Sequence, residues 1–519
     1  MNKKILLPVM ALALTFASCD MDKEPYDSIP TDEALVTPTD FESMRNNLYR
    51  MMRISVGNTS AINAPDIQCD EFNAVAGYLG TFGYMYTWSY AENLQEAGTV
   101  YGNYQAVIAT SNFVIDGYNK CDMSNEIVFT PDAMKEVNET KGVAFFTRAF
   151  ALYNLAQYFC IDYEDDATAD APNSGVSYRL DFYPSDDVAT YPARKTLRET
   201  YAQIVEDLDS AAKYITVAPE RSNYYISTDA VKAMQARVAL SMDNYPLAAQ
   251  LASEVANSTT YRFANSVNNL NNMWEHGTSS TTDPETIFKL SVRNVDERVG
   301  QMGQIYWPAR EGQSPDYLPT QAVINLYPEG DYRKSVYFSL EDMQTNTGES
   351  GSVYILSKYP YEGYLYNLNS GDEYSRAMVQ PKVFRISEMY LIAAEAYAMM
   401  GGTENEAKAK SYLGEQMRNR IRNFNISSEL GSLTGQDLLE VIREERQREF
   451  LGEGMRLFDL KRWHLGVTRG TPQNESMCLQ PGSATTTGLV KGATDNQIVW
   501  PIPQAEVNAN PNVVQNPGY

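Results

Sequence analysis

The side chains that most often carry catalysis are few and poorly spaced in this sequence of 519 residues. His276 and His464 are the only histidines, and they match no zinc-binding spacing. There is no nucleophile-elbow pattern and no phosphate-binding loop. Glycoside hydrolysis needs only two carboxylates, and 66 acidic residues guarantee chance pairs, so that activity stays open as an alternative. The motifs therefore favour a function without catalysis.

A helix rich in Arg and Glu near the C-terminus has a structural interpretation. Glu444 and Arg448 stand four residues apart, which is the spacing of a stabilising pair on a helix surface. We predict that Arg446 and Glu449 are partly buried and bonded across helices, because a lone buried charge would be costly. Two large side chains are predicted to anchor the end of this helix and the Pro-rich tail: Trp463 and Trp500.

Neither a cofactor nor a firm metal site is predicted. The acidic run at residues 162–166 could offer oxygen ligands to calcium, but it lacks a complete calcium-loop pattern and is better interpreted as a solvated charge run. Cys69, Cys121, Cys160 and Cys478 are widely spaced and allow three disulfide pairings. Free buried thiols are the alternative, and spacing does not decide between them.

The N-terminus has the features of an export signal. Lys3 and Lys4 precede an apolar run at residues 5–16, which is too short to span a membrane. We therefore predict a signal peptide over residues 1–18. The small residues before Cys19 resemble a lipobox, so Cys19 is the predicted lipidation site; an ordinary signal peptide with an incidental cysteine is the alternative. Residues 19–38, which are acidic and contain prolines, would form a tether.

The whole sequence, before any processing, carries a strong negative charge. Its 66 acidic and 42 basic residues give a net charge of −24, and no basic patch stands out. Nucleic acid is therefore a poor partner. Acidity suits a soluble, surface-exposed protein and argues weakly against anionic polymers as ligands.

Helical patterns dominate the chain. Helices are predicted over about 41–53, 95–118, 133–159, 196–215 and 434–451. Residues 228–258 and 387–420 look like two helical hairpins of one kind, with small residues at helical spacing and a break between the helices. This patterning is tetratricopeptide-like, at about 34 residues per unit. Unrelated Ala-rich hairpins are the alternative. Residues 260–380 predict loops and short strands inserted between the helices.

Three segments of the sequence resemble the SusD/RagB family of Bacteroidetes nutrient-binding lipoproteins. The segments are residues 385–397, residues 442–463 and the C-terminal stretch 500–519, which contains Trp-Pro-Ile-Pro and closes on Gln-Asn-Pro-Gly-Tyr. The N-terminal half agrees more loosely, and Gly175-Val-Ser-Tyr178 departs from the family, which often has Pro after Gly-Val.

The resemblance implies a fold and a function. The fold would be mainly α: a tetratricopeptide-like superhelix of helix pairs over residues 39–519, with ligand-face loops at about 66–94 and 260–380. The protein would be lipid-anchored in the outer membrane, facing the cell exterior, and would bind oligosaccharide or polysaccharide. It would deliver the glycan to a SusC-like TonB-dependent transporter. Asp20, Asp22 and Glu24 resemble the export signal of such lipoproteins.

Aromatic side chains in the loops are the predicted glycan contacts. A sugar ring presents an apolar C–H face that matches a flat aromatic ring, and a rim of hydroxyls that matches polar side chains. The candidate aromatic residues are Trp88, Trp274, Tyr306 and Trp307, and the candidate polar residues are Asn73, Asn271, Asn272 and Arg310. A helical-repeat lipoprotein that binds peptide or protein is the alternative function, because a fold does not fix a function.

Overall fold

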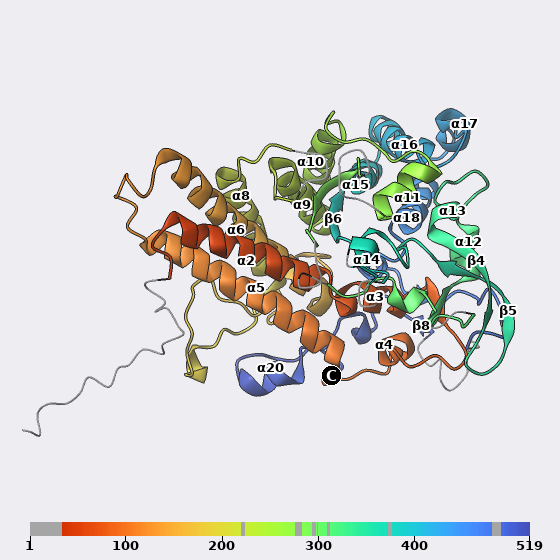
Figure 1. Ribbon diagram of the computed structural model, residues 1–519, viewed down its shortest axis with the longest axis horizontal. Coiled ribbons are helices and arrows are strands. Elements are labelled where there is room, and N and C mark those ends of the chain that lie inside the picture. Colours follow the sequence, from red (N-terminus) through yellow and green to blue (C-terminus); the bar gives the residue numbers. More distant parts are fainter. Residues whose placement is uncertain are drawn as a thin grey trace, which may run out of the picture.

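The computed structural model is built mainly from helices. It describes residues 34–219, 224–275, 283–292, 297, 299–308, 312–368, 370–371, 376–479 and 489–519. The strands in these ranges are short and paired two by two (Figure 1). The predicted mainly-α class is confirmed. Cys19 and the predicted signal peptide lie outside the described residues.

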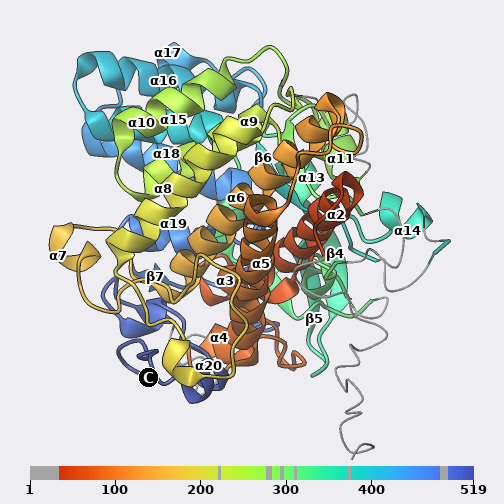
Figure 2. The ribbon, with the colours of Figure 1, turned by 90° about the vertical axis from the view of Figure 1, so that its left-hand side faces the viewer.

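Three long helices lie side by side at the N-terminal end of the molecule: α2 (Pro38–Val56), α5 (Gln95–Lys120) and α6 (Pro131–Phe159) (Figures 1 and 2). Helix α2 begins three residues before the predicted start at about residue 41. The side chain of Thr37 accepts a hydrogen bond from the Asp40 N–H in a capping box, and the proline that follows Thr37 takes the first helical position. Proline suits that position because its missing N–H would have no helical partner there.

The two predicted helical hairpins are confirmed. The first consists of α9 (Thr228–Ser241) and α10 (Tyr245–Ala256), and the second of α15 (Ile386–Met400) and α16 (Thr403–Arg418). Helix α10 packs against α15, so the hairpins stack on each other. The break between α15 and α16 falls at Gly401-Gly402, both of which have positive φ (66° and 82°), a conformation that glycine adopts without strain.

Further helices link and extend these pairs. Helix α8 (Leu197–Tyr214) packs between α6 and α9. It lies within the predicted range 196–215, and Thr196 and Glu199 form a capping box at its start. Helix α18 (Gly435–Phe450) packs against α15, and α19 (Arg456–Arg462) follows it. The shorter helices are α3 (Thr59–Gln68), α4 (Gly83–Thr87), α7 (Asp166–Ala169), α11 (Val267–Glu275), α12 (Gln321–Asn325), α13 (Lys334–Tyr337), α14 (Tyr364–Leu368), α17 (Ile426–Leu430) and α20 (Gln504–Ala509).

The strands tie the inserted segments to the helical scaffold. All four pairs are antiparallel: β1 (Phe72–Ala74) with β3 (Tyr317–Pro319), β2 (Thr286–Lys289) with β6 (Lys382–Arg385), β4 (Phe338–Gln344) with β5 (Ser350–Leu356), and β7 (Val467–Thr468) with β8 (Val490–Lys491). The β1–β3 pair joins the two segments predicted to form the ligand face.

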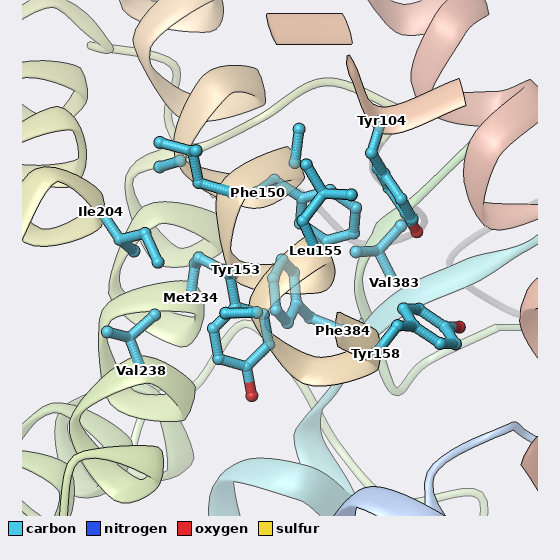
Figure 3. Packing of buried hydrophobic residues seen from close by; sticks show 14 of the residues in the cluster. Tyr104, Phe150, Tyr153, Leu155, Tyr158, Ile204, Met234, Val238, Val383 and Phe384 are labelled. Carbon is cyan, nitrogen blue, oxygen red and sulfur yellow. The ribbon is translucent and has the colours of Figure 1, made fainter. Parts of the chain in front are cut away.

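The main core surrounds α6, which is buried along most of its length. Figure 3 shows its side chains Phe150, Tyr153 and Tyr158 close to Val383 and Phe384 of β6. Small residues on α9 and α10, such as Ala233 and Ala252, are fully buried. Their size lets neighbouring helices approach closely.

A buried ion network joins the inserted region to the last long helix. Glu449 of α18 accepts hydrogen bonds from Arg385 (2.7 Å), Arg420 (2.9 Å) and Arg333 (3.1 Å), and its side chain is fully buried. Burial alone would raise the pKa of Glu449, but the guanidinium groups of Arg420 and Arg385 hold it well below its usual range. The structural interpretation of this helix is confirmed. Arg446 also pairs with Asp459 of α19 at 3.0 Å.

The two predicted anchors are also buried. The indole N–H of Trp500 donates to Gln68 Oε1 at 2.9 Å, and that of Trp463 donates to Glu395 at 2.6 Å. A tryptophan in a core needs such a partner for its N–H, and here the partner also fixes where the chain docks.

Other sequence hypotheses concern metal binding, thiols and the membrane. In the acidic run, Asp165 caps α7 and Asp166 pairs with Arg198, so these carboxylates already have partners. No group of three or more His, Cys, Asp or Glu in the described ranges could hold a metal ion. Cys69, Cys121 and Cys160 are free thiols, and Cys478 is buried. Of the helices that are described, none is both long and apolar enough to cross a membrane.

Candidate functional site

A surface hollow of about 460 Å³ lies where the inserted segments meet. Its walls come from parts of the chain that are far apart in sequence: α11, the loop after Tyr306, α13 with β4, and the turn after β5. The lining residues are Asn271, Trp307, Ser335, Val336, Phe338, Ser339, Ser357, Pro360, Tyr361 and Glu362. Two of the predicted residues, Asn271 and Trp307, are therefore brought together.

Two aromatic rings form one side of the hollow. The rings of Trp307 and Tyr361 lie with their centres 5.3 Å apart and their planes inclined by only 33°. Trp307 is half-buried, and its indole N–H donates to the Tyr359 carbonyl at 2.7 Å. This hydrogen bond fixes the ring while leaving part of it accessible, which is what a stacking platform requires.

A charged group steadies the second ring. The guanidinium carbon of Arg376 lies 5.1 Å from the centre of the Tyr361 ring, within the range of a cation–π contact. Arg376 also pairs with Glu362 at 3.3 Å and lies 5.4 Å from the Tyr366 ring. The pair places a carboxylate on the rim of the hollow, because Glu362 is itself exposed.

Short polar side chains complete the rim. Ser335 and Asn271 are exposed, while Ser339 and Ser357 are half-buried. The Ser357 hydroxyl donates to the Val336 carbonyl at 3.1 Å, and the Ser339 hydroxyl donates to Glu341. Each of these hydroxyl oxygens keeps the capacity to accept a hydrogen bond from a ligand. The floor is apolar, since Val336 and Phe338 are buried.

The other predicted rings do not face solvent, and this corrects the predicted aromatic set. Trp88 is 3% exposed, and its indole N–H donates to the Gln68 carbonyl at 2.9 Å. Tyr306 is fully buried, with its ring 4.7 Å from that of Phe72. Trp274 is 4% exposed and lies in the interior. The packing of neighbouring segments covers all three rings, which local sequence does not reveal.

Of the predicted polar residues, too, some lie at the hollow and others do not. Asn73 is buried in β1 and donates to the Gly470 carbonyl at 3.0 Å, so it serves the fold instead of a surface site. Asn272 is half-buried beside Asn271 on α11. Arg310 lies outside the described residues.

Sequence reasoning missed Tyr361 and Glu362. The signal was present, because the stretch 359–364 reads Tyr-Pro-Tyr-Glu-Gly-Tyr, with aromatic residues set between helix-breaking ones. An aromatic residue held between Pro and Gly is typical of a loop that presents a ring.

Comparison with known proteins decides the family. A model described as the SusD family matches residues 222–519, which is more than half of the chain. The chain belongs to the SusD family. A second family model, described as starch-binding and associating with the outer membrane, matches residues 21–240.

Relatives and solved structures of this family agree over nearly the whole length. SusD-like protein P2 from Formosa agariphila is 24% identical over 557 aligned positions, which span 100% of both chains. A SusD superfamily protein from Bacteroides thetaiotaomicron has a TM-score of 0.75 at 25% identity, covering 93% of this chain and 100% of its own. A SusD-like carbohydrate-binding protein from Bacteroides vulgatus has a TM-score of 0.70 at 18% identity, covering 92% and 97%.

Proposed function

We propose that this SusD-family protein is a cell-surface lipoprotein that captures oligosaccharide or polysaccharide and does no chemistry on it. One observation carries the proposal: the hollow presents two neighbouring aromatic rings, Trp307 and Tyr361, with their planes inclined by 33°, beside a rim of hydroxyl, amide and carboxylate groups. The names of the second family model and of the Bacteroides vulgatus neighbour support carbohydrate as the ligand class.

The arrangement suits a pyranose ring. The C–H face of the sugar would rest on the accessible part of Trp307, and its hydroxyls would reach Asn271, Ser339 and Glu362. Such contacts are shallow and partly hydrated, so the affinity for one sugar unit would be modest. A longer glycan would gain from further contacts outside the hollow.

The membrane attachment and the partner are also part of the proposal. Removal of residues 1–18 would leave Cys19 as the lipidated N-terminus, followed by the tether. The folded domain begins earlier than the predicted residue 39, because Leu35 is buried and Pro38 is the first residue of α2, so the end of the predicted tether at 19–38 is part of the fold. The protein would then be held at the outer membrane, facing outward, beside a SusC-like TonB-dependent transporter that receives the glycan. Membership of the SusD family supports this assignment.

The test is calorimetry on the non-lipidated mature protein, after a glycan array has supplied a ligand. Trp307→Ala and Tyr361→Ala should each weaken binding by about thirtyfold or more, which corresponds to at least ~2 kcal/mol for an aromatic contact at the centre of a site. Tyr84→Ala is a matched control, because this tyrosine is 69% exposed but does not line the hollow. The control should bind as the unmodified protein does.

Three results would contradict the proposal. Unchanged affinity in both hollow variants would remove the assigned site. Binding to a peptide pool but to no saccharide would favour the peptide-binding alternative. New reducing ends in excess of the protein concentration would show a glycoside hydrolase.

A further inference from the structure

The first described residues of the chain pack on a small hydrophobic core of their own, where α2 begins and α5 ends. Leu35 is buried there against Gly117 of α5, and its side chain leaves no room for a side chain at that glycine. We call this cluster the end core. Its buried members are Leu35, Phe41, Phe129 and Val137, and its half-buried members include Phe113, Tyr118 and Met134.

Two loops from other parts of the chain pack on the end core. The loop between α5 and α6 supplies Phe129, which is one of the buried members. The loop at residues 179–183 is attached through Phe182, whose ring lies 5.0 Å from the ring of Phe113. The Phe182 N–H also donates to the carboxylate of Asp116 at 2.8 Å. The start of the described chain and these two loops therefore meet at one end of the helical scaffold.

Each of these three segments exposes apolar side chains to solvent. Ile127 is 89% exposed and Tyr183 is 55% exposed. The exposed apolar residues of the three segments are Val36, Ile127, Val128, Leu180 and Tyr183. Single exposed apolar residues are common on soluble proteins, but several that gather around one point mark a surface that makes contact with something apolar.

Hydrogen bonds hold the turn that carries Ile127 in place. The Ile127 N–H donates to Asn125 Oδ1 at 3.1 Å, and the N–H groups of Val128 and Phe129 donate to the Asn125 carbonyl at 3.0 and 2.8 Å. Phe129 points into the end core, whereas Ile127 is almost fully exposed. The exposure of Ile127 is therefore a feature of a folded turn.

The length of chain between Cys19 and the end core indicates what lies against this surface. Residues 20–33 separate Cys19 from the first described residue, Ala34. A flexible chain of that length spans about 20 Å on average, and at most about 50 Å when fully extended. A domain of this size has a radius of gyration of about 23 Å. A lipid on Cys19 would therefore keep the end core, more than any other part of the domain, close to the bilayer.

We propose that the exposed residues around the end core form a membrane-contact surface, which rests in the headgroup region of the bilayer that holds the lipid of Cys19. This inference rests on the lipid anchor, which is part of the proposed function. Tyrosine is enriched at such interfaces because its ring is apolar and its hydroxyl is polar. Aliphatic side chains such as Ile127 gain by burial there.

The contact would be shallow, and the tether would make it effective. Glu126 and Arg179 lie beside Ile127 and Leu180 in the sequence, and their charges would stay among the headgroups. A few apolar side chains bind a membrane weakly on their own, but a tether of this length raises their local concentration at the bilayer.

The contact would also orient the surface hollow. In Figure 1 the beginning of α2 and the end of α5 lie at the left, while β4, which supplies Phe338 and Ser339 to the hollow, lies at the right. A domain that rests on its end core would hold the hollow away from the bilayer, on the side from which a glycan arrives.

The test is fluorescence quenching on the lipidated protein in vesicles of phosphatidylethanolamine and phosphatidylglycerol, without a transporter. Cys121→Ser forms the background, because the other three cysteines of the folded domain are buried. An environment-sensitive label on Ile127→Cys should be at least threefold less accessible to iodide than in the soluble chain that begins at residue 20. Spin-labelled phospholipid should quench the same label. Tyr183→Cys should behave in the same way.

Leu340→Cys is the matched control, because Leu340 of β4 is 57% exposed and lies on the opposite side of the molecule. A label there should remain fully accessible to iodide on the vesicles. A second pair of variants tests the apolar character of the contact: Tyr183→Asp should restore iodide access to the Ile127 label at least twofold, whereas Leu340→Asp should not. Both positions are exposed, so the melting temperature should not change.

Two outcomes overturn the proposal. In the first, the Ile127 label is as accessible to iodide as the Leu340 label. In the second, iodide is excluded but lipid-borne spin labels do not quench, which means that a second copy of the protein covers the surface.

Mass spectrometry of the N-terminus separates this inference from the proposed function. If Cys19 carries lipid but Ile127 is accessible, the membrane-contact surface fails and the anchor stands. If Cys19 carries no lipid, both fail. Glycan binding is measured at the hollow, which shares no residue with this surface.

Discussion

The buried ion network and the surface hollow both contain charged or polar side chains, but these side chains have different roles in the two regions. In the network, Glu449 and the three arginines around it are fully or almost fully buried, and they satisfy one another at 2.7–3.1 Å. In the hollow, Glu362 and Ser335 are exposed and keep free hydrogen-bonding capacity toward solvent. Buried polar groups whose hydrogen bonds are all made within the protein stabilise the fold. Polar groups beside an accessible aromatic surface still have hydrogen-bonding capacity and are available to a ligand.

The strongest test of this difference between the network and the hollow is the substitution Glu449→Ala. The change leaves three guanidinium groups without their shared carboxylate, so we expect the free energy of unfolding to fall by about 3–5 kcal/mol. Urea denaturation measures this loss. Glu444→Ala on the same helix is the control, because its side chain is 53% exposed and its contact with Arg448 is 3.7 Å long. It should change stability by no more than ~0.5 kcal/mol, and an equal loss in both variants would refute the distinction.

The next prediction separates a buried ring from an accessible one. Trp88→Ala should cost about 3–5 kcal/mol of stability, because it empties a core position. Trp307→Ala should cost less than half as much, since the ring is half-buried, while it abolishes most glycan binding. Thermal denaturation and calorimetry on both variants check the two effects. If Trp88→Ala were as stable as Trp307→Ala, the assignment of Trp88 to the core would be wrong.

A smaller effect on the stability of the fold is expected when pH changes the protonation of a buried carboxyl group, that of Asp66. Burial raises the pKa of Asp66 well above its usual range, although the Gly454 N–H that donates to it acts in the opposite direction. The folded state therefore binds a proton more tightly than the unfolded state does, so this group favours folding at low pH, and that contribution is lost as pH rises through the folded pKa.

Asp66→Asn mimics the protonated carboxyl, so its stability relative to the unmodified protein should improve from about pH 5 to about pH 8. Denaturation at several pH values measures the slope. Asp122→Asn is a control at a fully exposed carboxyl, where hydrogen bonds from Ser124 lower the pKa, so the group is ionised in both the folded and the unfolded state over this pH range and the stability difference should not change with pH. A pH-independent difference for Asp66→Asn would show that the carboxyl is not protonated on folding.

The smallest effect is expected at the rim. Glu362→Gln keeps the shape of the side chain but removes its charge, so glycan affinity should fall about three- to tenfold, as for one hydrogen bond of ~0.5–1.5 kcal/mol. Stability should stay unchanged, because the pair with Arg376 is exposed. Calorimetry with the same glycan checks this. A tighter complex would mean that the carboxylate repels the ligand.

The helical framework was largely predictable from the sequence. The capping box at Thr196, the Gly401-Gly402 break and the small residues of α9 and α10 all act within a few residues of their own position. Local propensity and periodicity record such features directly. The role of Glu449 was predictable for a similar reason, because so many charges on one helix can be buried only if they are paired.

The sequence by itself determined the fold class, the family and the chemical character of the loops. Only the tertiary structure decided which loop rings reach solvent: Trp88 and Trp274 became core, while Trp307 met Tyr361 and Asn271 in one hollow. The physical reason is that the exposure of a ring depends on which distant segments pack over it. That packing depends on contacts across the whole chain, so the residues next to the ring in the sequence do not indicate whether the ring is buried.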